Sequence, residues 1–297
     1  MLTYLTSAIF TSLLLLLVST KSKGDEVLVI PNPSLSPSDI DLLEFPLNLE
    51  YLEAEFFLWG SLGYGLDMVA PNLTAGGPPP IGGKKANLDP VTRDIILQFA
   101  YQEVGHLRAM HKENYCYIRR PFLSLSEPQI AAALERKIRP CEAATHGFHL
   151  TFSSPSHVLR NLYCQYPLYP PFDPYTNGLN FLIASYIIPY VGLTGYVGAN
   201  PKLQSAQAKR LVAGLLGVES AQDAVIRALL HERASLKVQP YDITVAELTN
   251  RISDLRNDIG KQGLKNEGLI VPLELGAEGR ISGNVIAGDR DSVAYDR

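Results

Sequence analysis

An apolar repeat with alternating steps of three and four residues occurs in four separate stretches of this chain and constrains its fold more than any other feature. In residues 39–62 large side chains form the repeat, namely Leu42, Phe45, Leu49, Leu52, Phe56 and Trp59. Residues 89–112, 201–236 and 244–260 carry comparable repeats. This spacing places apolar residues on one face of an α-helix, and no strand pattern of similar strength is present. The sequence therefore predicts an all-α protein.

Capping signals indicate where these helices begin and end. Asp89 and Pro90 suit the N-cap and the first position of the second helix. The helix over 201–236 is expected to start at Pro201. "TVAE", residues 244–247, matches a capping box. Gly260 is expected to end the helix that this box opens.

Three further features concern the shape of the predicted helices. Pro46 lies inside the first turns of helix 39–62, so this helix is alternatively expected to begin near it. Residues 63–88 are rich in Gly and Pro and predict a long loop. Residues 180–200 carry no charge and are long enough to cross a membrane. Their Gly, Pro and Tyr content favours instead a helix buried in a bundle and bent at Pro189.

Polar residues lie on faces that the apolar repeat marks as buried. Glu103 and His106 are three residues apart, in the middle of the stripe of the second helix. Glu219 and Gln222 have the same spacing in the helix over 201–236. A buried carboxylate is costly unless it is paired or bound to a metal, so these positions call for an explanation.

Helix 39–62 adds more acids. Glu50 and Glu53 lie on the inner flank of its apolar stripe, whereas Glu44 and Glu55 are expected to face water. Three helices can therefore each bring an acid to the interior of one bundle. Glu50 is the acid of this helix that we take as a candidate ligand.

Two explanations fit these polar residues. Carboxylates with an imidazole suit iron or manganese in a helix bundle. Alternatively, Glu103 and His106 form a buried ion pair that holds the helices in register. Because metal–oxygen bonds are about 2 Å long, convergence of Glu50, Glu103 and Glu219 to within roughly 6 Å, without counter-cations, would favour the metal.

The first residues resemble a targeting segment. Residues 1–24 begin with an apolar, uncharged stretch followed by small residues, which predicts a cleaved secretory signal peptide, with an uncleaved signal anchor as the alternative. Secretion would make Asn72, in the sequon Asn72-Leu73-Thr74, a candidate glycosylation site. A net charge of −4 and scattered Lys and Arg argue against a nucleic-acid surface.

Residues 113–168 form an atypical segment that contains all the cysteines, Cys116, Cys141 and Cys164. Their odd number leaves at least one thiol unpaired in an oxidising compartment. Cys141 could join His146 and His149 in a ligand cluster, but the spacing matches no zinc motif. The segment is either an insertion or a gene-model artefact, and we favour the artefact.

Several long stretches of the chain resemble the plant desiccation-related proteins, a secreted family within the ferritin-like superfamily. The stretches are "DIDLLEFPLNLEYLEAEFFLWG", "NLDPVTRDIILQFAYQEVGHLRAM", "PPFDPYTNGLNFLIASYIIPYVGLTGYVGANPKL" and "LLGVESAQDAVIRALLHERA". The resemblance covers about residues 39–112 and 169–297. It implies a ferritin-like four-helix bundle over 39–261, with an accessory C-terminal helix and a Gly-rich irregular tail over 262–297.

The ferritin-like ligand pattern carries over only in part. It implies Glu50, Glu103, His106 and Glu219 as metal ligands, and Gln222 stands where a complete site has His. The third helix offers Pro189 near the place of its acid, and residues 179–200 contain no Asp or Glu. The resemblance therefore implies one metal ion, iron or manganese, or none.

Two functions remain open at this point. The first, which the sequence favours, is a non-enzymatic, secreted stress protein that shields cell-wall or membrane-surface components and retains a degenerate metal site. The second is a metal-dependent oxidase or a metal-sequestering protein that uses the partial carboxylate–histidine site.

Overall fold

The computed structural model describes residues 36–112, 119–125, 170, 172–260 and 265–296. The predicted signal peptide over 1–24 and all the cysteines lie outside these residues, as does the candidate cluster of Cys141, His146 and His149.

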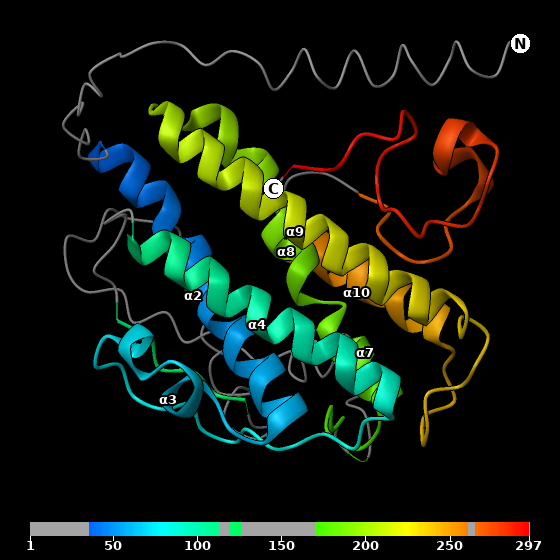
Figure 1. Ribbon diagram of the computed structural model, residues 1–297. Helices are drawn as coiled ribbons and strands as arrows, with labels where there is room; N and C mark the ends of the chain where they lie inside the picture. Colours follow the sequence, from blue (N-terminus) through cyan, green and yellow to red (C-terminus); the bar gives the residue numbers. More distant parts are fainter. Residues whose placement is uncertain (1–35, 113–118, 126–169, 171, 261–264, 297) are drawn as a thin grey trace, which may run out of the picture. The chain divides into compact units, whose positions relative to one another are not determined.

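Helices dominate the described part of the chain, and four helical segments form a bundle (Figure 1). They are α2 (Pro37–Leu62), α4 (Pro90–Lys112), a third segment divided into α7 (Gly178–Ser185) and α8 (Ile188–Ala199), and α9 (Ala206–His231). α2 packs along α4 and α8 packs along α9, while α2–α8 and α4–α9 contacts join the two pairs. The predicted all-α bundle is confirmed, and isolated bridges are the only β pairing among the described residues.

Caps at both ends explain the length of α2. The Ser36 hydroxyl accepts a hydrogen bond from the Asp39 backbone N–H, and Pro37 occupies the first turn. The helix continues through Pro46, so the alternative start near that residue is wrong. Gly63 ends the helix with φ of 87°, a left-handed conformation that glycine adopts without strain.

Other expected boundaries hold in part. Asp89 caps α4 through the Val91 and Thr92 backbone N–H groups. The capping box at Thr244 and Glu247 opens α10 (Val245–Gly260), which ends at the expected glycine. The expected loop over 63–88 is partly helical, because it contains α3 (Leu66–Val69) and the 3-10 turn η1 (Pro71–Thr74).

The third segment and α9 begin differently from the prediction. The break falls at Tyr186 and Ile187, and Pro189 lies in the first turn of α8, where no backbone donor is needed. Pro201 lies in a separate 3-10 turn, η2 (Asn200–Lys202). α9 starts later, where the Ser205 hydroxyl accepts the Ala208 N–H. The start of α9 is therefore set by the Ser205 side-chain cap and not by Pro201.

The stretch Gly178–Lys202 is long and apolar enough to cross a membrane, and within the described residues no other stretch meets that test. In this structure 83% of its most apolar window is buried inside the protein. Such burial supports the interpretation of this stretch as a bundle helix.

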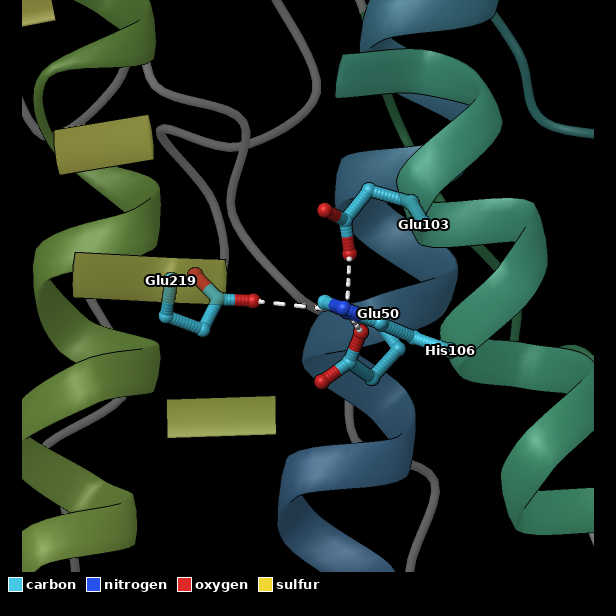
Figure 2. Close-up of side chains that lie close together, drawn as sticks. All are labelled: Glu50, Glu103, His106 and Glu219. Atoms are coloured by element: carbon cyan, nitrogen blue, oxygen red, sulfur yellow. Dashed lines mark hydrogen bonds and ion pairs between the residues drawn. The ribbon is translucent and has the colours of Figure 1, made fainter. Parts of the chain in front are cut away.

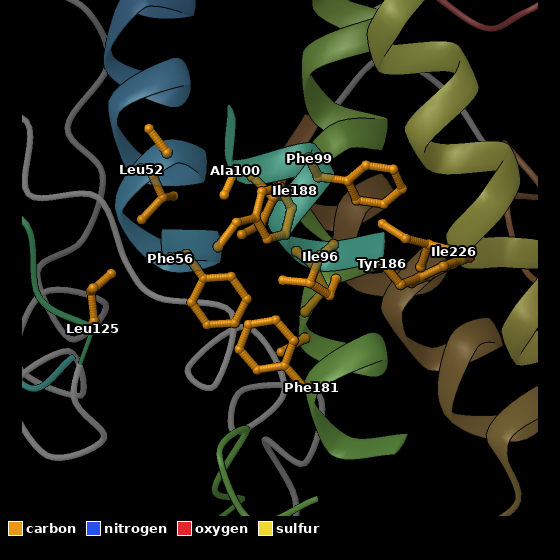
Figure 3. Close-up of a cluster of buried hydrophobic side chains, with 14 of the residues drawn as sticks. Leu52, Phe56, Ile96, Phe99, Ala100, Leu125, Phe181, Tyr186, Ile188 and Ile226 are labelled. Atoms are coloured by element: carbon orange, nitrogen blue, oxygen red, sulfur yellow. The ribbon is translucent and has the colours of Figure 1, made fainter. Parts of the chain in front are cut away.

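Aromatic and aliphatic side chains from several helices fill the core (Figure 3). Phe56 of α2 stacks on Phe181 of α7 with ring centroids 4.5 Å apart. One turn further along α2, a Cβ at Gly60 would lie 2.1 Å from Cζ of Phe181. Glycine at this position therefore permits the close approach of α7 to α2.

Residues 119–125 belong to the fold although they fall in the atypical segment over 113–168. The Ile81 N–H donates to Leu123 O, and the Leu125 N–H donates to Ile81 O. Arg120 is buried and donates to Glu55 Oε1 at 2.5 Å and to Asp67 Oδ2 at 2.7 Å. Residues 119–125 therefore pack against α2, α3 and the loop after them, and residues 126–168 lie outside the described residues.

The contact with Arg120 corrects one expectation. Glu55 was expected to face water, yet it is fully buried, and it also accepts the Leu66 backbone N–H. α3 and the segment around Arg120 cover the flank of α2 that an isolated helix would expose. Glu44 is exposed, as expected.

The tail over 265–296 is irregular apart from two 3-10 turns, η3 (Leu273–Leu275) and η4 (Ala277–Gly279). Arg227 of α9 is fully buried and anchors the tail through its guanidinium. It donates hydrogen bonds to backbone carbonyls of Glu267, Gly268, Asn284 and Val285. Arg256 of α10 donates to the carbonyls of Tyr186 and Ile187, where the third segment breaks. These two arginines hold α10 and the tail against the bundle.

Candidate metal centre

Three helices bring their inward acids to one point inside the bundle. Glu50 comes from α2, Glu103 and His106 from α4, and Glu219 from α9, and Figure 2 shows the four side chains pointing toward one another. One ligand atom from each lies within 4.8 Å of the others. The i, i+3 spacing of Glu103 and His106 places both on the same helix face, which is why α4 supplies two of the four.

The imidazole of His106 lies between the carboxylates. Its Nδ1 is 2.7 Å from Oε2 of Glu50 and 3.0 Å from Oε2 of Glu103. Oε1 of Glu219 is 3.7 Å from the same nitrogen. The predicted convergence is therefore present, and the predicted Glu103–His106 pair is present within it.

Most of these groups are cut off from water. Glu53, Glu103 and Glu219 are 0% exposed, and Glu50 is 1% exposed. Within the described part of the chain, no hydrogen-bond donor reaches either oxygen of Glu53 or of Glu219. Nε2 of His106 also has no hydrogen-bond partner among these residues. Native structures leave few buried polar atoms unsatisfied, and a bound ion is one of the accepted reasons for such atoms.

The electrostatics divide the cluster into the pair of His106 and Glu50, in which both charged forms are favoured, and the remaining acids, whose pKa values are raised. Burial alone would lower the pKa of His106, but Glu50 and Glu103 outweigh it and raise that pKa to about 12. Burial would raise the pKa of Glu50, but His106 holds it below its ordinary value. Burial raises the pKa of Glu103 to about 7. Burial and neighbouring carboxylates raise the pKa of both Glu53 and Glu219 well above the usual range.

The residues present fit a divalent cation. Metal–oxygen bonds of about 2.1 Å place opposite ligand atoms about 4.2 Å apart, so a cluster spanning 4.8 Å needs only a small contraction. Carboxylate oxygens with one imidazole nitrogen suit iron and manganese. Such a cation would take the place of the protons that the buried acids otherwise hold.

The third helical segment leaves room for this centre. A Cβ at Gly192 of α8 would lie 3.0 Å from Oε2 and 3.1 Å from Cδ of Glu219. The absence of a side chain at this position therefore accommodates the Glu219 carboxylate. α8 offers no acid of its own, as the sequence predicts.

Neighbouring polar groups orient the carboxylates. The Tyr196 hydroxyl of α8 donates a short hydrogen bond to Oε1 of Glu50. Gln222 donates its amide to Oε1 of Glu103 at 2.5 Å and to Oε1 of Gln102 at 3.1 Å. Because Gln102 is exposed, Gln222 links the buried cluster to the surface of α4.

The sequence-predicted residues are thus placed as follows. Glu50, Glu103, His106 and Glu219 converge, and Gln222 contacts Glu103. Asn72, the predicted glycosylation residue, is exposed on η1.

Two neighbours of the cluster were missed as functional candidates. Glu53 was placed on the inner flank of α2 but not counted as a ligand, and its i, i+3 relation to Glu50 was the available signal. Tyr196 lies in the uncharged stretch 180–200, and no sequence signal distinguishes it from the other tyrosines there.

Comparisons with known proteins agree with this fold. A family model described as "Ferritin-like domain" matches residues 38–232. The desiccation-related protein PCC13-62 of Craterostigma plantagineum is 55% identical over 260 residues, which cover 88% of this chain and 74% of that protein. The ferritin-like catalase Nec2 of Nesocodon mauritianus is 52% identical over 260 residues, covering 88% of this chain and 75% of that protein. No solved structure matches the chain.

Proposed function

The chain belongs to the ferritin-like family and, within it, to the plant desiccation-related proteins, and from this premise we propose that it is a stress-related metalloprotein that decomposes hydrogen peroxide. Iron or manganese would be held by Glu50, Glu103, His106 and Glu219. The observation that supports this most directly is the buried convergence of these four residues within 4.8 Å. The name of the 52% identical relative, a ferritin-like catalase, supports peroxide as the substrate.

This proposal reverses the order of the two functions that the sequence left open. Sequence reasoning favoured a non-enzymatic protein because the third-helix acid is absent. It also expected convergence of the acids without counter-cations to favour a metal, and the cluster meets this criterion only in part, because His106 is a counter-cation. Among the described residues, His106 is the one basic group that ion-pairs with Glu50, Glu103 or Glu219.

The reaction balances without any further oxidant or reductant. One hydrogen peroxide is oxidised to O₂ with loss of two protons and two electrons, and a second takes up both and becomes two water molecules. A bound redox-active cation supplies the electron transfer that this exchange needs.

The chain's own residues orient the ligands and control access. Tyr196 fixes Glu50 through its hydroxyl, and Gln222 fixes Glu103 through its amide. Burial of all the carboxylates keeps bulk water out, which strengthens their electrostatic effect. The Gln102–Gln222 pair lies between the centre and solvent, and its amides suit a small hydrogen-bonding substrate such as peroxide.

Oxygen release by the purified full chain tests the proposal. Protein loaded with Mn²⁺ or Fe²⁺ is expected to release one O₂ for every two peroxides consumed. Glu103→Gln should lose both metal and activity, whereas Glu44→Gln, an exposed acid on α2, should retain both. Metal-loaded protein that binds its ion but releases no oxygen would end the catalytic proposal.

A protective function without catalysis is the second candidate, and the 55% identity to a desiccation-related protein supports it. It predicts that the protein preserves the activity of a test enzyme, or the integrity of lipid vesicles, through drying and rehydration. Glu103→Gln should protect as well as the unchanged protein. Equal protection without oxygen release would favour this candidate and its cell-wall or membrane-surface partners.

Secretion and glycosylation are part of the same proposal. Secretion rests on the apolar composition of residues 1–24, and glycosylation on the exposure of Asn72 within its sequon. Expression in plant cells should place the protein in the apoplast with its first residues removed. Glycosidase treatment should increase gel mobility, and Asn72→Gln should abolish that change.

A further inference from the structure

A cavity separate from the candidate metal centre lies between the end of α9 and the tail. Its volume is about 450 Å³, within the range of roughly 300–1,000 Å³ that is usual for small-molecule sites. His231, the last residue of α9, lines it together with tail residues between Ala277 and Ala294. The four residues of the candidate metal centre do not line it, so its use is a separate question.

Short and apolar side chains form most of the wall of this cavity. Ile281 and Ile286 line it and are 54% and 74% exposed. Exposed apolar side chains gain free energy when a ligand covers them, so the wall favours an occupant with an apolar body. Much of the remaining wall consists of glycines and alanines, namely Ala277, Gly283, Ala287, Gly288 and Ala294.

Hydrogen bonds fix this wall without a ligand. The buried guanidinium of Arg227 donates to the carbonyls of Asn284 and Val285. Further along the tail, the Asp289 N–H donates to Val293 O, and the Val293 N–H donates to Oδ1 of Asp289. A wall held in this way is largely preformed, so a ligand does not have to order it on binding.

His231 supplies a polar group with hydrogen-bonding capacity to spare. Its Cε1 lies 3.6 Å and its Nε2 4.0 Å from the position that a Cβ at Gly283 would take, so this edge of the ring faces wall that has no side chain. Nδ1 is buried and has no hydrogen-bond partner among the described residues. A neutral imidazole donates through one nitrogen and accepts through the other, so it can pair with a hydroxyl group.

The charges around the cavity limit the class of ligand. Asp289 lines it, and no Lys or Arg among the described residues does so. An anionic ligand would therefore meet a carboxylate without a compensating cation. Asp289 is half-buried and already accepts the Val293 N–H, so it offers little to an amine. A neutral ligand fits this lining best.

We propose that the cavity binds a small neutral phenol, with its ring against the short apolar wall and its hydroxyl hydrogen-bonded to the imidazole of His231. A flat ring makes close contact with glycines and alanines and can also stack on the imidazole. The phenol O–H both donates and accepts, so it pairs with a ring nitrogen in either tautomer. This inference goes beyond the proposed function and does not depend on the metal centre.

Isothermal titration calorimetry of the full chain with 4-methylphenol tests the proposal. Toluene has the same ring and methyl group without the hydroxyl, and it should bind about tenfold more weakly. Benzoate and benzylamine, an anion and a cation of similar size, should also bind more weakly than the phenol. Chelator-treated and Mn²⁺-loaded protein should give the same affinities. Absence of 4-methylphenol binding, or tighter binding of benzylamine, would overturn the proposal.

Two variants locate the site. Gly283→Val should abolish binding of 4-methylphenol and toluene, because the new side chain fills the space beside His231. His231→Phe should weaken the binding of 4-methylphenol about tenfold and leave that of toluene unchanged. Leu273→Ala, at an exposed tail residue outside the lining, is the control and should bind like the unchanged chain. Circular dichroism and thermal melting confirm that each variant is folded.

The variants also define the results that contradict the proposal. Equal affinity of the unchanged chain and His231→Phe for 4-methylphenol would overturn the hydrogen bond to the imidazole. Retained binding in Gly283→Val would place the phenol elsewhere on the protein and overturn the site. Either result would leave the proposed metal centre standing, because none of these residues contacts it.

Discussion

Gln222 donates its side-chain amide to Oε1 of Glu103 at 2.5 Å, from the position where a complete ferritin-like site has histidine. The amide thus holds a carboxylate that a metal would need, and its own oxygen is buried without a partner among the described residues. Gln222 therefore supports the centre by orienting Glu103 through a hydrogen bond, and it does not supply the nitrogen ligand that a histidine would.

Restoring the histidine should strengthen metal binding. Gln222→His adds an imidazole nitrogen at the edge of the cluster, and we expect the affinity for Mn²⁺ or Fe²⁺ to rise about tenfold, equivalent to about 1.4 kcal/mol. Competition with a chelator of known affinity measures the change. A weaker affinity would mean that the Gln222–Glu103 hydrogen bond contributes more than the added ligand.

Tyr196→Phe should destabilise the metal-free protein by about 1–3 kcal/mol, because it leaves Oε1 of Glu50 buried without its donor. Metal loading should reduce this loss, since the freed oxygen can then coordinate. Urea unfolding with and without Mn²⁺ measures both values. Tyr64→Phe, at an exposed tyrosine, is the control and should change little. An equal loss in both conditions would argue that Oε1 of Glu50 does not coordinate.

Gly192→Ala should weaken metal binding while leaving the fold intact. The new Cβ would lie 3.0 Å from Oε2 of Glu219 and push this carboxylate aside. Gly195→Ala on the same helix is the matched control, because nothing lies within 4 Å of its Cβ position. It should stabilise the protein by about 0.5–1 kcal/mol through helix propensity and leave metal content unchanged. Similar metal content in both variants would contradict the role given to Gly192.

Arg120→Ala should cost about 3–5 kcal/mol of unfolding free energy, because it leaves Glu55 buried without its cation. Asp67→Asn should cost about 1 kcal/mol or less, since the Asp67 side chain is 50% exposed and water can replace the contact. Urea unfolding measures both variants. Equal costs would show that Glu55 does not depend on this arginine.

Asp39 should make stability depend on pH. Burial would raise its pKa, but the Gln204 and Ser205 backbone N–H groups, at 2.7 and 2.9 Å, outweigh burial and hold the pKa below its ordinary value. Its contribution is therefore present above the unfolded pKa of about 3.9 and lost as pH falls through the lower folded value.

The pH effect can be isolated by comparison with Asp39→Asn. At pH 7 the variant should be less stable by about 1–3 kcal/mol, through loss of hydrogen bonds to a charged acceptor. The difference should shrink as the pH falls below about 4. Urea unfolding of both proteins across this range measures it, and a difference that stays constant would contradict the pairing of Asp39 with the Gln204 and Ser205 backbone N–H groups.

Much of the centre could be predicted from the sequence. Periodicity and capping signals placed α2, α4 and α10 closely, and the helical repeat directed Glu50, Glu103, His106 and Glu219 inward. The sequence also shows that the third segment contains no acid over residues 179–200. These features are local, because a helix of known phase fixes the direction of each side chain relative to its own apolar stripe.

Other features depended on tertiary contacts. Glu55 lies on the flank of α2 that an isolated helix would expose, and it is buried because α3 and Arg120 cover it. Likewise, Glu53 is fully buried in the bundle, and no donor among the described residues reaches its carboxylate. The sequence thus determined which way each acid points, and only the packing of distant segments decided what each acid meets, because burial and charge pairing are properties of the assembled bundle.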